Sequence, residues 1–132
     1  MVELLVVVAI VLILLVFLTM STRRPRIRTY QVHCINNMKQ IGLAARIWSN
    51  DHNDTFPPDL ITMKNELNTP RILFCPADTK VVRVTEWPEL NPSTISYRYL
   101  NPNGSDLEPS KPLIICPIHG HVGLGDGSVH RK

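Results

Sequence analysis

The sequence lacks the residue patterns that mark an enzyme active site. Ser128, Asp126 and several histidines crowd the C-terminal tail, but no nucleophile motif and no pair of carboxylates is spaced for a reaction. No internal repeat is visible along the 132 residues. These absences predict a protein that is not an enzyme.

The charge pattern also lacks the signs of a nucleic-acid-binding surface. The formal net charge is only +3, and its basic part is local. Four arginines lie just after residue 20: Arg23, Arg24, Arg26 and Arg28. The interleaved aromatic residues and glycines that a nucleic-acid surface uses are missing around them. Their position beside an apolar run instead predicts contacts with lipid headgroups.

The first 20 residues lack both the basic start and the small-residue cleavage site of a signal peptide. Every residue from Leu4 to Leu18 is apolar. A helix of about 20 residues reaches roughly 30 Å, the thickness of the hydrocarbon core of a bilayer. We therefore predict a retained membrane helix. Its one charged residue is Glu3, and an acid at the edge of such a helix is costly unless it has a partner.

A helical pattern resumes beyond Pro25, which should kink or briefly interrupt the helix. Apolar residues then follow one another at steps of three and four: Ile27, Tyr30, Cys34, Met38, Ile41, Ala45 and Trp48. We predict one long helix, roughly residues 2–51, which is apolar all round in its first half and amphipathic in its second.

The rest of the chain favours short elements joined by turns. Asp59 is expected to cap a short helix over residues 60–67. Strands are predicted at residues 71–75, 81–87, 95–99 and 113–116, and a terminal hairpin with its turn at Gly125–Gly127. The predicted fold class is α+β, with a long N-terminal helix packed against a small antiparallel sheet. We expect an apolar helix over residues 1–24 and a globular domain over residues 25–132.

The segment Glu3–Ile10 (ELLVVVAI) resembles the E-L-L-V-V-x-A-I block of type IV pilins and type II secretion pseudopilins. Cys34–Ala44 (CINNMKQIGLA), Cys75–Asp78 (CPAD) and Gly125–Val129 (GDGSV) resemble a branch of pseudopilin-like proteins found in planctomycetes and verrucomicrobia. In the family this block follows a short basic leader ending in Gly and then a mature Phe. Both are missing from this sequence, and we expect that a start site placed too late, or trimming, has removed them ahead of Met1.

The resemblance implies a pilin-like fold and a structural subunit of a filament. Such a subunit waits in the bacterial inner membrane, is processed by a prepilin peptidase and is assembled by a membrane platform with other pilin or pseudopilin subunits. Glu3 would pair with the N-terminal amine of a neighbouring subunit. The arginines alone would place the domain in the cytoplasm. The implied leader would hold the N-terminus there instead and leave the globular domain extracytoplasmic.

In an extracytoplasmic domain, Cys75 and Cys116 are candidates for a disulfide worth about 2–4 kcal/mol. Each of them precedes a proline. Cys34 is expected to be a small core residue, with pairing to either of the other cysteines as the alternative. A competing interpretation is a zinc site built from Cys75, Cys116, His119 and His121, which together offer four suitable ligands.

Calcium is the second metal to consider. Asp126 lies in a Gly-Asp-Gly turn, and its carboxylate, Ser128 and nearby carbonyl groups offer the oxygen ligands that calcium prefers. The simpler interpretation of Asp126 is an ordinary turn residue. The alternative function is a single-pass membrane-anchored binding module, which would use the Cys/His tail for a metal or ligand and would not polymerise.

Overall fold

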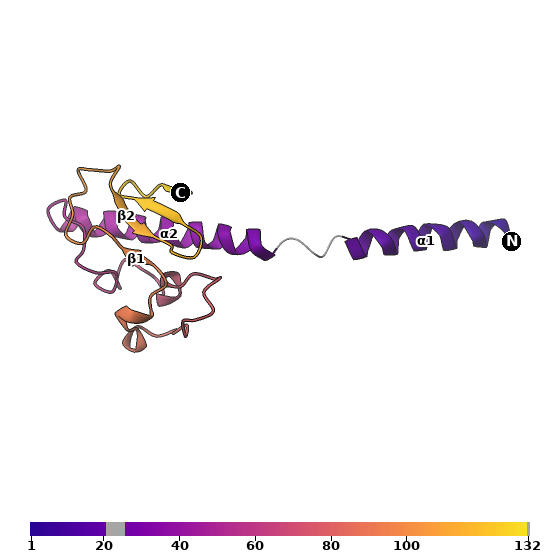
Figure 1. The fold of residues 1–132 in the computed structure, drawn as a ribbon, viewed down its shortest axis with the longest axis horizontal. Helices are drawn as coiled ribbons and strands as arrows, with labels where there is room; N and C mark the ends of the chain where they lie inside the picture. The colour runs from indigo at the N-terminus through magenta and orange to yellow at the C-terminus, as the bar shows by residue number, and fades with distance from the viewer. Residues whose placement is uncertain (21–25, 132) are drawn as a thin grey trace.

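The computed structural model describes residues 1–20 and 26–131. Two helices come first, an irregular stretch follows, and a four-stranded antiparallel sheet ends the chain (Figure 1). The predicted α+β class is confirmed. The expected kink at Pro25 and the continuity of one helix from residue 2 to residue 51 fall on residues 21–25, which lie outside the described residues.

Helix α1 (Val2–Met20) forms from an almost wholly aliphatic sequence. It contains no glycine or proline to interrupt the backbone hydrogen bonds. Residues 2–19 are long and apolar enough to cross a membrane by length and composition, and none of them is buried within the protein. The predicted apolar helix is therefore present, and the globular domain does not bury its side chains.

Helix α2 (Arg26–Asp51) is amphipathic and contributes one face to the core. The predicted stripe is buried over its later turns, where Cys34, Met38, Ile41 and Ala45 are at most 1 % exposed. Tyr30 departs from the prediction with 43 % exposure. The helix lies against the sheet and the residues after position 69, and these elements cover only its C-terminal part.

The sheet is a simple antiparallel meander. Its strands are β1 (Arg98–Tyr99), β2 (Pro112–Ile115), β3 (His121–Leu124) and β4 (Val129–Arg131), in spatial order of their numbers. Tyr99 lies opposite Ile114, and Gly123 opposite Val129. The predicted terminal hairpin is confirmed, and Gly127 adopts a φ of 83° in its turn, a conformation that glycine adopts without strain.

Two glycines bring this hairpin close to α2. A Cβ atom at Gly42 of the helix would lie 3.0 Å from the Cα atom of Gly127. The backbones approach each other at van der Waals distance here, so the hairpin turn packs directly on the helix.

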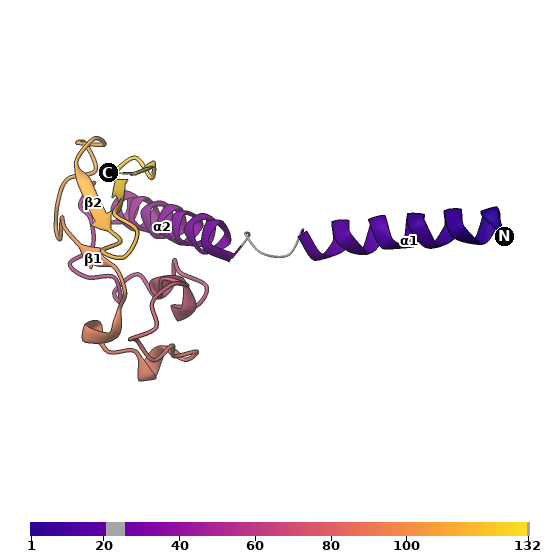
Figure 2. The same ribbon diagram turned by 45° about the vertical axis from the view of Figure 1, so that its right-hand side comes forward.

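Residues 56–96, here called the middle segment, contain no strand. Their regular structure is limited to three short 3-10 helices: η1 (Pro70–Leu73), η2 (Trp87–Glu89) and η3 (Pro92–Thr94). The segment lies to one side of α2 and the sheet in both views (Figure 2). Phe56, Met63 and Leu73 from this segment are at most 1 % exposed. Side-chain burial, rather than a backbone ladder, therefore attaches it to the core.

The helix predicted over residues 60–67 is wrong, although its cap is present. The Asp59 carboxylate accepts hydrogen bonds from the backbone N–H groups of Ile61 (2.9 Å) and Thr62 (2.7 Å). The chain then makes successive turns. Lys64 N–H donates to the Ile61 carbonyl three residues back. Helix nucleation is unfavourable, and a segment this short forms too few hydrogen bonds to offset it. The cap at Asp59 alone is therefore not sufficient to form a helix.

Two predicted strands are also wrong. Residues 71–75 begin in helix η1, because Pro70 occupies its first position and the Thr69 hydroxyl accepts a hydrogen bond from Arg71 N–H. Residues 81–87 pair with no strand. Val81, Val84 and Trp87 are partly buried against the core at steps of three residues, which differs from the alternation of a strand.

The other strand predictions hold in part. The strand expected over residues 95–99 is reduced to the two residues of β1, and Ser96 N–H donates to the Leu73 carbonyl rather than to a strand. The strand expected over residues 113–116 is present as β2, displaced by one residue.

Candidate functional site

Glu3 lies in the first turn of α1, as the sequence predicts. Its carboxylate has no hydrogen-bond or ion-pair partner among residues 1–20 and 26–131. An acidic side chain interacts favourably with the positive end of the helix dipole, but that contribution is small. The partner that this carboxylate needs in an apolar environment must therefore come from outside the described chain.

The remainder of α1 presents apolar side chains in every direction. The exposed fraction of its large apolar residues runs from 48 % at Val8 to 76 % at Val2. A helix that is apolar all round belongs in a membrane or inside a bundle. The whole circumference of α1, rather than one stripe, is thus a candidate contact surface.

The second candidate is a cluster of four side chains inside the globular domain, here called the Cys3His cluster. It consists of Cys34, Cys75, Cys116 and His119. The three sulfur atoms and a ring nitrogen of His119 all lie within 4.8 Å of one another. The His119 Nδ1 atom is 3.4 Å from the Cys75 sulfur and 3.7 Å from the Cys116 sulfur. All three cysteines are free and fully buried.

Three different parts of the fold deliver these ligands. Cys34 comes from the buried face of α2, Cys75 follows helix η1, and the turn after β2 carries Cys116 and His119. The Asn37 side chain, one turn beyond Cys34, donates to the backbone carbonyl of Phe74 at 3.1 Å. This hydrogen bond holds Phe74, the residue before Cys75, against α2.

Both Cys-Pro dipeptides form tight turns. Asp78 N–H donates to the Cys75 carbonyl at 3.0 Å, and Gly120 N–H donates to the Cys116 carbonyl at 2.9 Å. Gly120 adopts a φ of 68°, which lets the chain reverse directly after His119. The turn therefore holds Cys116 and His119 on the same side of the chain.

The three thiols do not ionise independently. Hydrogen bonds from the Cys34 and Cys75 thiols hold the pKa of Cys116 far below its usual range. The same contact with Cys116 raises the pKa of Cys34 and that of Cys75, and burial adds to both increases. Ionisation of one thiol thus opposes ionisation of the others, and a negative charge on all three needs a cation beside them.

Two aromatic side chains border the cluster. The Tyr97 hydroxyl lies 3.7 Å from the Cys34 sulfur and is the donor of that contact. Burial raises the pKa of Tyr97, which therefore stays a neutral phenol. The His121 ring stacks on His119, with ring centroids 5.5 Å apart and planes 21° from parallel.

The sequence predicts Cys75, Cys116, His119 and His121 as possible zinc ligands. In the structure, the fourth member of the cluster is Cys34 rather than His121. His121 is 4 % exposed, and neither of its ring nitrogens has a hydrogen-bond partner within the described chain. Burial lowers its pKa, so this ring is neutral. The prediction that Cys34 is a core residue on the apolar stripe is confirmed, because it is fully buried. Its place on the stripe directs its thiol inward, but the stripe alone does not say which side chains it meets there. The disulfide between Cys75 and Cys116 stays a prediction.

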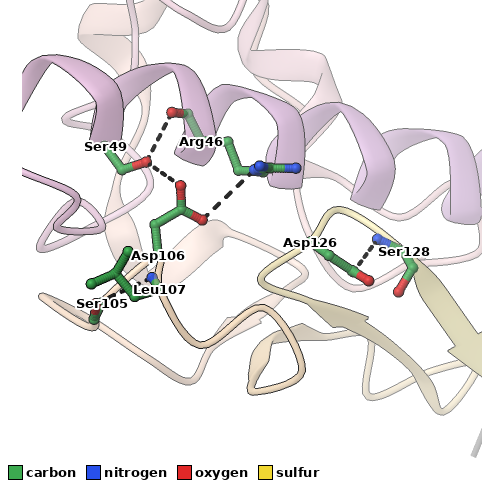
Figure 3. Close-up of polar contacts among 7 residues, drawn as sticks. All are labelled: Arg46, Ser49, Ser105, Asp106, Leu107, Asp126 and Ser128. Atoms are coloured by element: carbon green, nitrogen blue, oxygen red, sulfur yellow. Dashed lines mark hydrogen bonds and ion pairs between the residues drawn. The ribbon is translucent and has the colours of Figure 1, made fainter.

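Asp126 sits in the hairpin turn and is exposed. Its Oδ1 atom accepts a hydrogen bond of 2.7 Å from Ser128 N–H (Figure 3). Hydrogen bonds from the Ser128 side chain and backbone lower the pKa of Asp126. Within residues 1–20 and 26–131, the Cys3His cluster is the one group of three or more potential ligands with metal-binding spacing. The geometry of Asp126 is that of a turn residue.

Asp106 joins the loop after β1 to the end of α2. Its Oδ2 atom lies 3.0 Å from the hydroxyl of the fully buried Ser49, and its Oδ1 atom lies 3.7 Å from Arg46 Nε (Figure 3). The Ser49 hydroxyl also lies 2.8 Å from the Arg46 carbonyl. Backbone pairing between Thr55 and Ser105 reinforces the contact. The loop over residues 101–111 is thus attached to the helix.

Comparison with protein-family models, with curated proteins and with solved structures gives no match.

Proposed function

We propose that this protein is a non-enzymatic structural subunit of a filament of the type IV pilus or type II secretion pseudopilus kind. In this proposal it assembles through α1. The observation that carries the proposal is the uncovered apolar surface of α1 beside a folded globular domain that contributes nothing to covering it. The resemblance of residues 3–10 to the pilin block supports the same function.

Energetics require that α1 be covered. Burial of apolar surface is worth roughly 25 cal/mol per Å², so a 19-residue helix that is apolar except at Glu3 and Thr19 would drive insertion or association in water. Because the helix is apolar on all sides, contact with one partner along one stripe would leave most of its surface exposed to water. Lipid or a bundle of equivalent helices covers the full circumference.

Glu3 distinguishes a bundle from a simple anchor. An anchor gains nothing from an acid at the edge of its span, where the charge is costly. In a bundle of identical helices, the carboxylate can pair with the N-terminal amine of a neighbouring subunit, and the pair offsets the desolvation of both groups. The pair also fixes the axial register, because packing of Leu and Val side chains alone tolerates sliding.

The outer face of α2 provides a second contact between subunits. Val32, Leu43 and Ile47 are 56 %, 60 % and 46 % exposed. At 3.6 residues per turn they fall within about 60° of one another. This apolar strip faces away from the core that the opposite side of α2 enters. Lateral packing of neighbouring subunits would cover it.

The test replaces the Glu3 carboxylate in the full-length protein, in cells that make the assembly machinery. Glu3→Leu and Glu3→Gln subunits should stay in the membrane and be depleted from sheared filaments by roughly 100-fold or more, since breaking a buried ion pair costs several kcal/mol. Glu86→Gln, at an exposed acid of the middle segment, is the matched control and should assemble normally.

The outcomes separate the filament subunit from an anchored binding module. Filaments of normal number and register with Glu3→Leu would refute the role of Glu3. Wild-type protein that is found only in the membrane fraction, and never in sheared material, would favour the anchored module.

A further inference from the structure

We propose that Cys34, Cys75, Cys116 and His119 bind one zinc ion in a closed tetrahedral site. This inference is independent of whether the chain polymerises. Binding would take a zinc ion from solution and release to water the protons of those thiols that are still protonated. Four bonds from protein to metal would form, three through sulfur and one through the His119 ring.

Two of the distances between ligand atoms match the edges of a tetrahedron around a single ion. Zinc lies about 2.3 Å from sulfur and about 2.0–2.1 Å from histidine nitrogen. A tetrahedron with these bonds has sulfur–nitrogen edges of about 3.6 Å and sulfur–sulfur edges of about 3.8 Å. The His119 Nδ1 atom lies 3.4 Å from the Cys75 sulfur and 3.7 Å from the Cys116 sulfur, two of the three sulfur–nitrogen edges. All four ligand atoms lie within 4.8 Å of one another, which leaves room for one ion at their centre.

The ligand set is chemically selective. Thiolate and imidazole ligands suit zinc, whereas calcium and magnesium prefer oxygen. The three cysteines are 0 % exposed, and together with His119 they fill all four positions. No position is left for a substrate or water, so the site is of the structural rather than the catalytic type.

A neighbouring donor supports the negative charge of the thiolates around a divalent ion. The Tyr97 hydroxyl lies 3.7 Å from the Cys34 sulfur and donates to it. Second-shell donors of this kind orient and stabilise metal ligands.

A disulfide accounts for less of this arrangement. It would join two of the three sulfur atoms and leave the third buried thiol and the half-buried His119 ring without a role. The arrangement has a fold-level consequence as well. The ligands come from α2, the middle segment and the sheet, so one ion would tie together the three parts of the domain.

The test uses the full-length protein, solubilised in detergent and purified with reductant and without chelator. Elemental analysis should find one zinc per chain. Cobalt in place of zinc should give the visible absorption of a tetrahedral site with thiolate ligands. Cys34→Ser and His119→Gln should each lose the stoichiometric zinc, whereas the neighbouring His121→Gln and the exposed His130→Gln should keep it.

His119→Cys keeps the test decisive where a ligand loss prevents folding. It should retain one zinc and shift the cobalt spectrum toward that of four thiolates. Iron in place of zinc, or less than about 0.1 zinc per chain after zinc is offered, would overturn the proposal. So would a native Cys75–Cys116 disulfide with Cys34 free to react with an alkylating reagent. Loss of zinc from His121→Gln would overturn the ligand assignment.

Discussion

The middle segment and the sheet share one core, but different interactions hold them in place. The sheet residues bond to one another through a ladder, so their positions follow from strand pairing and register. The middle segment has no strand and three 3-10 helices of three or four residues. Its attachments are buried apolar side chains, a few side chain–backbone bonds, backbone bonds from Phe56 and Pro57 to the loop after β1, and Cys75. A segment without a ladder needs another kind of cross-link, and the proposed zinc site supplies it.

Removal of the metal should give the largest difference in stability between the middle segment and the sheet. A structural zinc ion contributes on the order of 10 kcal/mol in small domains. A strong chelator added to the full-length protein in detergent should therefore abolish amide-exchange protection in residues 56–96 first. Protection of β2 and β3 should fall less, because their ladder remains.

Hydrogen–deuterium exchange measured by mass spectrometry checks this order, with the zinc-loaded protein without chelator as the control. Equal loss of protection in both regions would show that the cluster supports the whole domain rather than the middle segment.

Substitutions that create cavities in the core should show whether the middle segment and the sheet unfold together. Leu73 of the middle segment and Leu113 of β2 are both 0 % exposed. Leu73→Ala and Leu113→Ala should each lower the free energy of unfolding by about 2–5 kcal/mol, from lost burial and the cavity that remains. Val82→Ala, at a residue 78 % exposed in the middle segment, should change it by less than about 0.5 kcal/mol.

Urea unfolding followed by tryptophan fluorescence and by circular dichroism measures these values. Coincident transitions in all variants would indicate one cooperative unit. A Leu73→Ala variant whose fluorescence transition precedes its circular dichroism transition would show that the middle segment opens separately.

The contact of Asp106 with α2 should give the smallest of these effects. Asp106→Ala removes a carboxylate acceptor whose side chain is 12 % exposed and should cost about 1–3 kcal/mol. Arg46→Gln removes only the charge partner, whose side chain is 51 % exposed, and should cost about 1 kcal/mol at most. The same urea experiment measures both. A larger cost for Arg46→Gln would assign the contact to the ion pair rather than to the Ser49 hydrogen bond.

Local patterns in the sequence predicted the elements that depend on one segment alone. The apolar run from Leu4 to Leu18 has the length and composition of α1. The stripe from Cys34 to Trp48 repeats every three or four residues, and that period places it on one face of α2. The final hairpin follows from alternation around a glycine turn. In each case, the spacing of apolar residues within one helix or hairpin is enough to predict which residues share a face.

The sequence-based prediction was wrong for residues 60–67, 71–75 and 81–87, where short apolar groups suit a helix, a strand or irregular chain alike. Packing against α2 and the sheet decided among these. The membership of the Cys3His cluster was also missed in part. Cys34 and His121 are both plausible ligands by type, and only the tertiary arrangement brought one of them to Cys75, Cys116 and His119.

The sequence by itself determined that this chain has an apolar N-terminal helix with an acid in its first turn, an amphipathic second helix and a closing hairpin. Tertiary structure decided how the middle segment is attached and which four side chains meet. The reason is the range of the interactions. Helix and hairpin patterns report contacts within a few residues, whereas the cluster depends on three segments that approach one another only when the core is complete.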